Sequence, residues 1–88
     1  MPELCRFNNI ILKMLYKDNE KHHKPHFHAR YGEYEASIGI DGEILAGRMP
    51  AKQLKLIQAW AILREEVLYE AWTNAVQGKP FNKIEPLH

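Results

Sequence analysis

Two histidines in the chain have a spacing that suits binding or catalysis. His26 and His28 are followed by Arg30 in the same alternating pattern. In an extended strand every second side chain points to the same face, so these three polar groups would share one face. Residues two apart lie ~6.5 Å apart along a strand, which lets two imidazoles converge on one metal ion, phosphate or carboxylate. The intervening residues suit the core side: Phe27, Ala29 and Tyr31.

One interpretation of this segment is an anion or nucleic-acid site. The residues predicted to bind the anion are His26, His28, Arg30 and Lys24. Lys13 and Lys21 would strengthen the local positive field around a phosphate. Because the ordinary pKa of histidine lies near neutrality, a pair of imidazoles can also perform acid–base chemistry on a phosphodiester. His26 and His28 are therefore also the candidate catalytic residues of a small hydrolase or nuclease.

A second interpretation is a site for a divalent metal, with His26, His28 and Glu35 as its ligands. Two histidines are too few for zinc. A zinc site has four protein ligands, or three with a water molecule in the open position. Glu35 completes the set only if its strand lies beside that of the histidines. His22 and His23, in the polar segment before Pro25, are the other residues that would complete it.

A third interpretation treats the histidines as an ordinary polar strand face, or as partners in hydrogen bonds within the fold. In each of the three interpretations we expect the face with His26, His28 and Arg30 to be at least partly accessible to solvent. A register shift of one residue would bury these polar groups, and each unsatisfied group would cost roughly 1–3 kcal/mol.

The elements that must position this segment form an α+β fold. The alternation of apolar residues and the turn residues between them predict an antiparallel meander of three to four strands. The predicted strands cover Ile10–Tyr16, Pro25–Tyr31, Tyr34–Ile40 and Glu43–Gly47, and residues 2–7 form a lead-in. Tyr34, Ala36, Ile38 and Ile40 should face inward. Asp41-Gly42 is a strong hairpin signal.

The apolar period changes to that of a helix between Pro50 and Gln77. One unbroken helix of this length would span ~40 Å, which exceeds what a small sheet can cover. We therefore predict either a break near Arg64 or packing on another chain. Trp60 and Trp72 lie on this segment and are the predicted interface residues of a homodimer, or of a heteromer with a small partner protein.

Length and composition describe one domain of 88 residues, with a sheet in 1–48, a helical half in 49–78 and an extended tail in 79–88. The formal net charge of +1 excludes a strong general attraction to nucleic acid or membrane, so an anion site must be local. The single cysteine, Cys5, excludes an internal disulfide, lies in no nucleophile motif and is typical of a cytoplasmic protein. We expect no membrane segment, because the longest apolar runs are too short.

The run from His23 to Ala36, His-Lys-Pro-His-Phe-His-Ala-Arg-Tyr-Gly-Glu-Tyr-Glu-Ala, resembles the signature of the small prokaryotic family named domain of unknown function 4160. The resemblance extends through Asp41-Gly42, the Gly47–Pro50 segment, Trp60 and the closing Lys83–Leu87 segment. Genes of that family often lie beside those of domain of unknown function 2442, an arrangement similar to toxin–antitoxin pairs. The resemblance thus implies an interaction module of such a pair.

Two functions stay open. The favoured one is an interaction module with a local anion or nucleic-acid binding face. The alternative is a metal- or histidine-dependent hydrolase or nuclease that uses His26 and His28. The interaction module is favoured because local spacing places no nucleophile or carboxylate pair beside the histidines.

Overall fold

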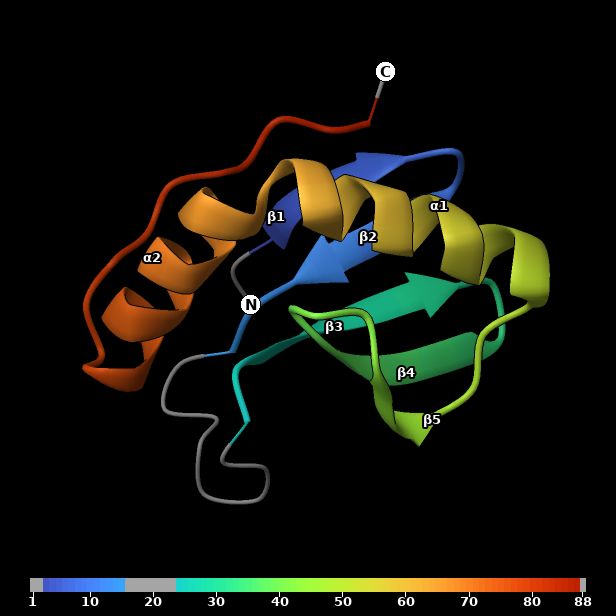
Figure 1. Ribbon diagram of the computed structural model, residues 1–88, viewed down its shortest axis with the longest axis horizontal. Coiled ribbons are helices and arrows are strands. Elements are labelled where there is room, and N and C mark those ends of the chain that lie inside the picture. Colours follow the sequence, from blue (N-terminus) through green and yellow to red (C-terminus); the bar gives the residue numbers. More distant parts are fainter. Residues whose placement is uncertain (1–2, 16–23, 88) are drawn as a thin grey trace.

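The computed structural model describes residues 3–15 and 24–87, which form a five-stranded antiparallel sheet and two helices. The strands lie in chain order, so each pairs with the next (Figure 1). Their bounds are β1 Glu3–Phe7, β2 Ile10–Lys13, β3 His26–Tyr31, β4 Tyr34–Gly39 and β5 Ile44–Gly47; the helices are α1 Ala51–Leu63 and α2 Glu65–Val76. The α+β prediction is confirmed, with one strand more than the three to four expected.

The additional strand is β1, in the segment that the sequence predicts as a lead-in. Asn8 and Asn9 form the turn between β1 and β2, and both have positive φ, at 49° and 64°. Two successive residues with positive φ are the geometry of the tight hairpin turn that matches the twist of two antiparallel strands. Asparagine tolerates this region better than most residues. The Asn-Asn pair therefore closes a hairpin in which Cys5 pairs with Leu12 and Phe7 with Ile10.

The hairpin of β3 and β4 follows from the two-residue turn Gly32-Glu33. Tyr31 pairs with Tyr34, and this closing pair fixes the register back to His26, opposite Gly39. Tyr34 was expected to face inward but is exposed at this end of the hairpin, where the Arg48 guanidinium lies 5.6 Å from the centre of its ring. The other residues predicted to face inward are buried: Ala36, Ile38 and Ile40.

Gly47 ends β5 in a conformation that only glycine adopts easily. Its φ is +76°, and a Cβ atom there would clash with the carbonyl oxygen of Glu35 on the neighbouring strand. This glycine lets the chain leave the sheet close to β4 and turn toward α1.

The helical segment contains two helices, and the chain breaks between them at Arg64. Of the two predicted alternatives, a break near Arg64 or packing on another chain, the break is confirmed. In Figure 1, α1 crosses one face of the sheet, and α2 lies at the end of the sheet where β2 ends and β3 begins. Trp60 of α1 is fully buried and meets Phe27 of β3 edge to face, with ring centres 5.4 Å apart. No helix in the described ranges is long and apolar enough to cross a membrane.

The C-terminal tail joins the helices to the first strand. The Ile84 amide donates a hydrogen bond to the Leu4 carbonyl, and the Trp60 indole donates one to the Glu85 carbonyl, at 2.8 and 2.9 Å. The core therefore lies between the sheet, both helices and this tail. It comprises Leu4, Cys5, Ile10, Leu12, Met14, Phe27, Ala29, Ala36, Ile38, Ile40, Met49, Ile57, Trp60, Ala61, Leu68, Ala71, Trp72, Ala75 and Ile84.

Candidate functional site

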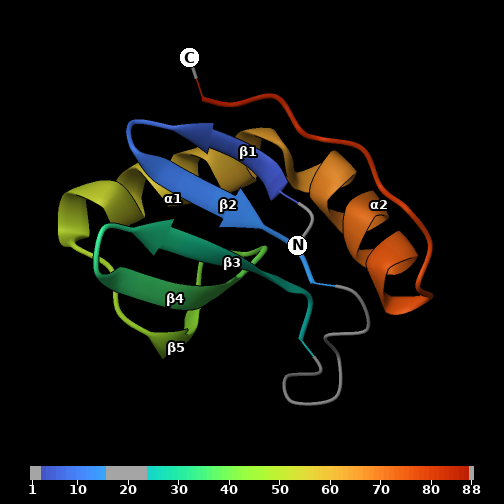
Figure 2. The same ribbon diagram turned by 180° about the vertical axis from the view of Figure 1, so that it is seen from behind.

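The sheet face opposite α1, called here the outer face, lies in front of α1 in Figure 2, with no helix drawn over its centre. Directly opposed residues on antiparallel strands point to the same face, and neighbouring strands lie ~4.8 Å apart. Register therefore sets Lys13, His28 and Ser37 side by side across β2, β3 and β4. We call these three residues the Lys13 row. A second row runs through Ile11, Arg30 and Glu35.

The Lys13 row borders a shallow hollow of about 310 Å³ in the outer face. The Ser37 hydroxyl and His28 Nδ1 are 3.3 Å apart and form a hydrogen bond in which the imidazole tautomer decides which group donates. Lys13 forms no ion pair within the part of the chain that the structure describes, and its side chain is half-buried. Arg30 and Glu35 line the same hollow. The hollow thus brings together an ammonium, an imidazole, a hydroxyl, a guanidinium and one carboxylate.

Two ion pairs modify the charge of the outer face. Arg30 Nε lies 3.8 Å from a Glu35 carboxylate oxygen, and both side chains are exposed, so this pair is weak. Arg6 and Glu3 pair more closely, at 2.6 Å, and the hydrogen bond between them lowers the pKa of Glu3 and raises that of Arg6. Lys13 makes no close ion pair with a described carboxylate, but Glu3 is its partner on β1, and the charge of Lys13 adds to the lowering of the pKa of Glu3.

The face that carries His26, His28 and Arg30 is partly accessible, as expected, because Arg30 is exposed and His28 is half-buried, but His26 itself is not accessible. Its ring lies 5.3 Å from that of His28, as the alternation predicted, but its side chain is fully buried. Trp72 of α2 packs 5.0 Å from it, and Nδ1 lies 2.8 Å from the Lys24 carbonyl. A carbonyl only accepts, so Nδ1 carries the proton that is donated. The cause is the break after α1, which lets α2 fold over the end of β3.

Lys24 also lies away from the hollow. Its ammonium is 2.7 Å from Asp41 and 3.1 Å from Glu43, two carboxylates in the connection between β4 and β5. These hydrogen bonds raise the pKa of Lys24 and lower that of Asp41. Lys24 therefore connects the start of β3 to the connection that follows β4. Of the four predicted anion-binding residues, His28 and Arg30 line the hollow, whereas His26 and Lys24 do not.

The structure brings no metal site together within residues 3–15 and 24–87. No three histidine, cysteine, aspartate or glutamate side chains in these ranges are close enough to hold a metal ion. Glu35 does lie on the strand beside that of the histidines, but it is opposite Arg30 and pairs with it. His22, His23 and Lys21, the other residues considered at the sequence level, lie outside the described residues.

The two tryptophans predicted for an interface are buried within this single chain. Trp60 is fully buried, and Trp72 is 9% exposed beside His26. The large apolar residues that the helices leave exposed are different ones: Ile62, Leu63, Val67 and Tyr69. Any surface for a partner on the helical half therefore centres on the corner between α1 and α2.

Sequence reasoning missed Ser37 as a member of the site, although a signal for it was present. The two-residue turn at Gly32-Glu33 sets Tyr31 opposite Tyr34, and counting outward from that pair reaches His28 opposite Ser37. Lys13 was considered only as part of a general positive field. Its position beside His28 has no such local signal, because a long polar segment separates β2 from β3.

The comparisons with known proteins place the chain in one family. No curated protein and no solved structure matches the chain. Residues 9–73 match the family described as Domain of unknown function (DUF4160), a span that holds β2 to β5, α1 and most of α2. This span includes every residue of the Lys13 row. The chain belongs to the DUF4160 family.

Proposed function

We propose that the protein is a small interaction module of a toxin–antitoxin-like gene pair, and that its outer face binds phosphate groups of a nucleic acid. The observation that carries the phosphate site is the Lys13 row. Lys13, His28 and Ser37 are neighbours on a sheet face whose centre no described helix covers, and Arg30 lines the same hollow. A phosphate accepts hydrogen bonds from each of these side-chain types, and the ammonium supplies a compact positive charge.

The chemistry of the face favours contacts to the backbone of a nucleic acid over contacts to its bases. The outer-face residues of the two rows include no phenylalanine, tyrosine or tryptophan, and their one aromatic ring is the half-buried imidazole of His28, which bonds to Ser37. The apolar member, Ile11, offers no hydrogen bond to a base edge. Phosphate contacts carry little sequence information, so we expect binding that depends strongly on salt and weakly on sequence.

Fluorescence anisotropy with a labelled single-stranded RNA of mixed sequence, measured at several salt concentrations, tests this site. Lys13→Ala should weaken binding and reduce the salt slope by about one. His28→Ala should weaken binding as well. Lys52→Ala is the matched control, because Lys52 is an exposed lysine on α1, on the other side of the sheet. Affinity that is independent of salt, or equal in the Lys13→Ala and Lys52→Ala variants, would exclude the phosphate site.

A second candidate function, a small hydrolase, is favoured by the 3.3 Å contact between Ser37 and His28. A serine beside a histidine is the pairing that activates the hydroxyl as a nucleophile, and such contacts are often long without substrate. His28 Nδ1 would take the Ser37 proton as Oγ attacks an acyl or phosphoryl centre, and Lys13 would stabilise the negative charge that develops. As the bond from that centre to the leaving group breaks, the imidazolium of His28 would return the proton to the leaving group. His26 has a different role here, because its Nδ1 donates to Lys24.

The hydrolase candidate has a test that needs no known substrate. Ser37 is the only serine in the chain, so a fluorophosphonate reagent that reacts with activated serines has one possible serine target. Labelling of the native protein, found by mass spectrometry on Ser37 and absent in His28→Ala, would support the hydrolase. An unlabelled native protein would leave phosphate binding as the function of the hollow.

A further inference from the structure

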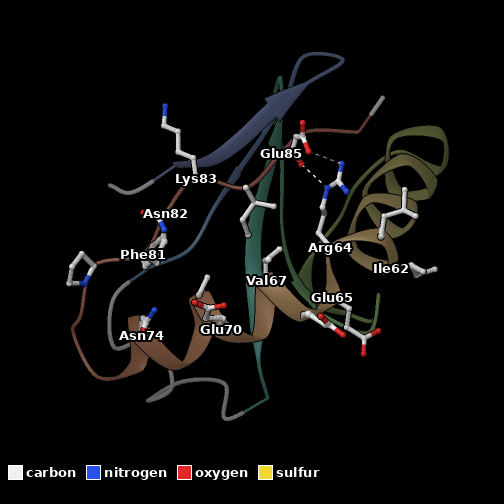
Figure 3. A pocket seen from close by; sticks show the side chains of 15 residues that line it. Ile62, Arg64, Glu65, Val67, Glu70, Asn74, Phe81, Asn82, Lys83 and Glu85 are labelled. Carbon is white, nitrogen blue, oxygen red and sulfur yellow. Dashed lines mark hydrogen bonds and ion pairs between the residues drawn. The ribbon is translucent and has the colours of Figure 1, made fainter.

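A groove of about 770 Å³ lies on the helical half, away from the outer face. Figure 3 shows its two sides: α2 forms one, and the tail that returns past α2 toward β1 forms the other. Val67, Glu70 and Asn74 lie along α2, and Phe81, Lys83 and Glu85 come from the tail. The corner between α1 and α2 closes one end. Neither wall is a strand, because residues 79–87 follow an irregular path.

The rim of this groove exposes large apolar side chains. Ile62 is 72% exposed, Leu63 63% and Val67 44%. Single exposed apolar residues are ordinary, but three around one groove indicate a binding surface. Two apolar residues of the lining are buried beneath them, Ala71 and Ile84, so the apolar surface continues into the groove.

The charges around the groove are mostly negative. Four glutamates line it, against one arginine and one lysine. The glutamates are Glu65, Glu66, Glu70 and Glu85. The arginine is engaged by the tail: Arg64 Nε and Nη2 donate to the carbonyls of Glu85 and Pro86, at 3.1 and 3.2 Å, and Nη2 also lies 3.9 Å from a Glu85 carboxylate oxygen. The open side of the groove, along α2, therefore presents carboxylates beside apolar side chains.

We propose that this groove binds a basic amphipathic helix of a partner protein, with apolar residues toward Leu63 and Val67 and lysines or arginines toward Glu66 and Glu70. A helix suits the groove because neither wall is a strand that an extended peptide could join, and a helix satisfies its own backbone. The proposal deepens the partner assembly within the proposed function and is independent of phosphate binding at the outer face.

A second copy of this chain fits the groove poorly. In a symmetric dimer each patch meets itself, so Glu65, Glu66 and Glu70 of one copy would face the same carboxylates of the other. Like charges brought together across an interface disfavour that contact. The charge pattern therefore selects a different chain of opposite charge as the occupant.

The test uses the full-length protein and two synthetic helical peptides of about 18 residues, ~27 Å long. Both carry leucines with i, i+3, i+4, i+7 spacing; the first has lysines on the flanks of this stripe and the second has glutamates there. We expect saturable binding of the lysine peptide, weakened by salt, and no binding of the glutamate peptide at about 1 mM. Equal binding of the two peptides, or none by the lysine peptide at that concentration, would overturn the proposal.

Four variants locate the binding surface. Glu70→Lys should weaken the binding of the lysine peptide about tenfold. Glu33→Lys, an equal charge reversal in the exposed β3–β4 turn, should leave this binding unchanged. Leu63→Ser should weaken it at least about fivefold, and Ile44→Ser, on β5, should have no effect. These exposed positions leave the fold intact, which an unchanged Tm verifies.

Outcomes for the two proposals remain separable. The affinity for RNA, measured by fluorescence anisotropy, should be the same in Glu70→Lys and the native protein, because Glu70 lies outside the hollow. Concentration-dependent dimerisation of the free protein that Leu63→Ser abolishes would overturn the proposal in favour of self-association.

Discussion

At the scale of single residues, two histidines that are neighbours on one strand have different surroundings. His26 is fully buried between Trp72 and the Lys24 carbonyl, to which its Nδ1 donates. His28 is half-buried, borders the hollow and bonds to Ser37. Burial with a fixed hydrogen bond is typical of a structural side chain, whereas partial exposure beside a hydroxyl and a lysine is typical of a site. The two residues should therefore respond differently to mutation.

Replacement of His26 by alanine should destabilise the protein, and the same change at His28 should not. His26→Ala leaves a cavity beside Trp72 and a carbonyl that loses its donor, so we expect a loss of about 2–4 kcal/mol. His28→Ala removes a half-buried ring and should cost under about 1 kcal/mol. Urea unfolding followed by tryptophan fluorescence measures both. Equal losses in the two variants would contradict this division of roles.

Cys5 should be chemically inert while the protein is folded. Burial of its side chain raises the pKa of the thiol to about 11, so the reactive thiolate is scarce at neutral pH. We expect a disulfide reagent such as dithionitrobenzoate to modify Cys5 at neutral pH only as fast as the protein unfolds. Rapid stoichiometric modification without denaturant, as in the denatured control, would show that the thiol is accessible.

Side-chain spacing alone predicted which residues share a face but not which of them stay exposed. The i, i+2 pattern correctly grouped His26, His28 and Arg30, because it depends only on the geometry of one strand. The burial of His26 depends on α2, whose path is set by tertiary packing. The sequence offered no local signal that Trp72 would lie against this strand. The position of Ser37 opposite His28, in contrast, could have been predicted by counting residues from the hairpin turn.

At the scale of elements, an ion-pair cluster fixes the start of β3 to the connection between β4 and β5. Lys24 bonds to Asp41 and Glu43, the Ile40 amide donates to the Pro25 carbonyl, and the Glu43 amide donates to the Asp41 carboxylate. Side-chain and backbone contacts thus connect two segments that are far apart in the sequence. This cluster also holds the Lys24 carbonyl that His26 requires.

The cluster predicts a pH dependence with a definite sign. The hydrogen bond from Lys24 lowers the pKa of Asp41, so the folded state releases this proton more readily than the unfolded chain. The resulting stability is present above the ordinary pKa of 3.8 and is lost as pH falls below it, through the lowered folded value. Asp41→Asn should therefore be less stable than the native protein at neutral pH, with a difference that disappears in acid.

Thermal unfolding over a pH series compares the native protein, Asp41→Asn and a Glu33→Gln control. Glu33 is an exposed carboxylate in a turn, so its variant should follow the native curve. A difference between Asp41→Asn and the native protein that stays constant down to acid pH would show that this ion pair does not carry the effect.

Elements with strong local signals were predicted well, and the weakly patterned ones were not. The change from a period of two to one of 3.6 located the helical segment. Its length against the size of the domain predicted either a break near Arg64 or packing on another chain, and the structure has the break. β1 was missed because its five residues lack clean alternation and contain a bulge, as the shift between Glu3 and Cys5 shows. Asn8-Asn9 was recognised as turn chemistry, but the strand before it was too irregular to identify.

At the scale of the whole molecule, the fold separates two surfaces of different charge. The charged side chains of the hollow are Lys13, Arg30 and one carboxylate, Glu35, whereas the groove by α2 carries four glutamates against one arginine and one lysine. A net charge of only +1 therefore conceals a local segregation that the composition could not reveal. Because the two surfaces are separate, the proposed phosphate site and the proposed partner groove do not compete for the same residues.

The tail should be essential for the stability of the whole molecule, although it has no regular secondary structure. Ile84 is buried, its amide bonds to Leu4, and the next residue, Glu85, accepts bonds from Trp60 and Arg64. Ile84→Ala removes the apolar anchor between β1 and the helices and should cost about 2–4 kcal/mol. It should also shift the tryptophan emission to the red if Trp60 gains solvent.

Lys83→Ala, an exposed neighbour on the same tail, is the control and should change stability by less than about 0.5 kcal/mol. If both variants unfold at the same urea concentration as the native protein, the tail is not part of the cooperative core.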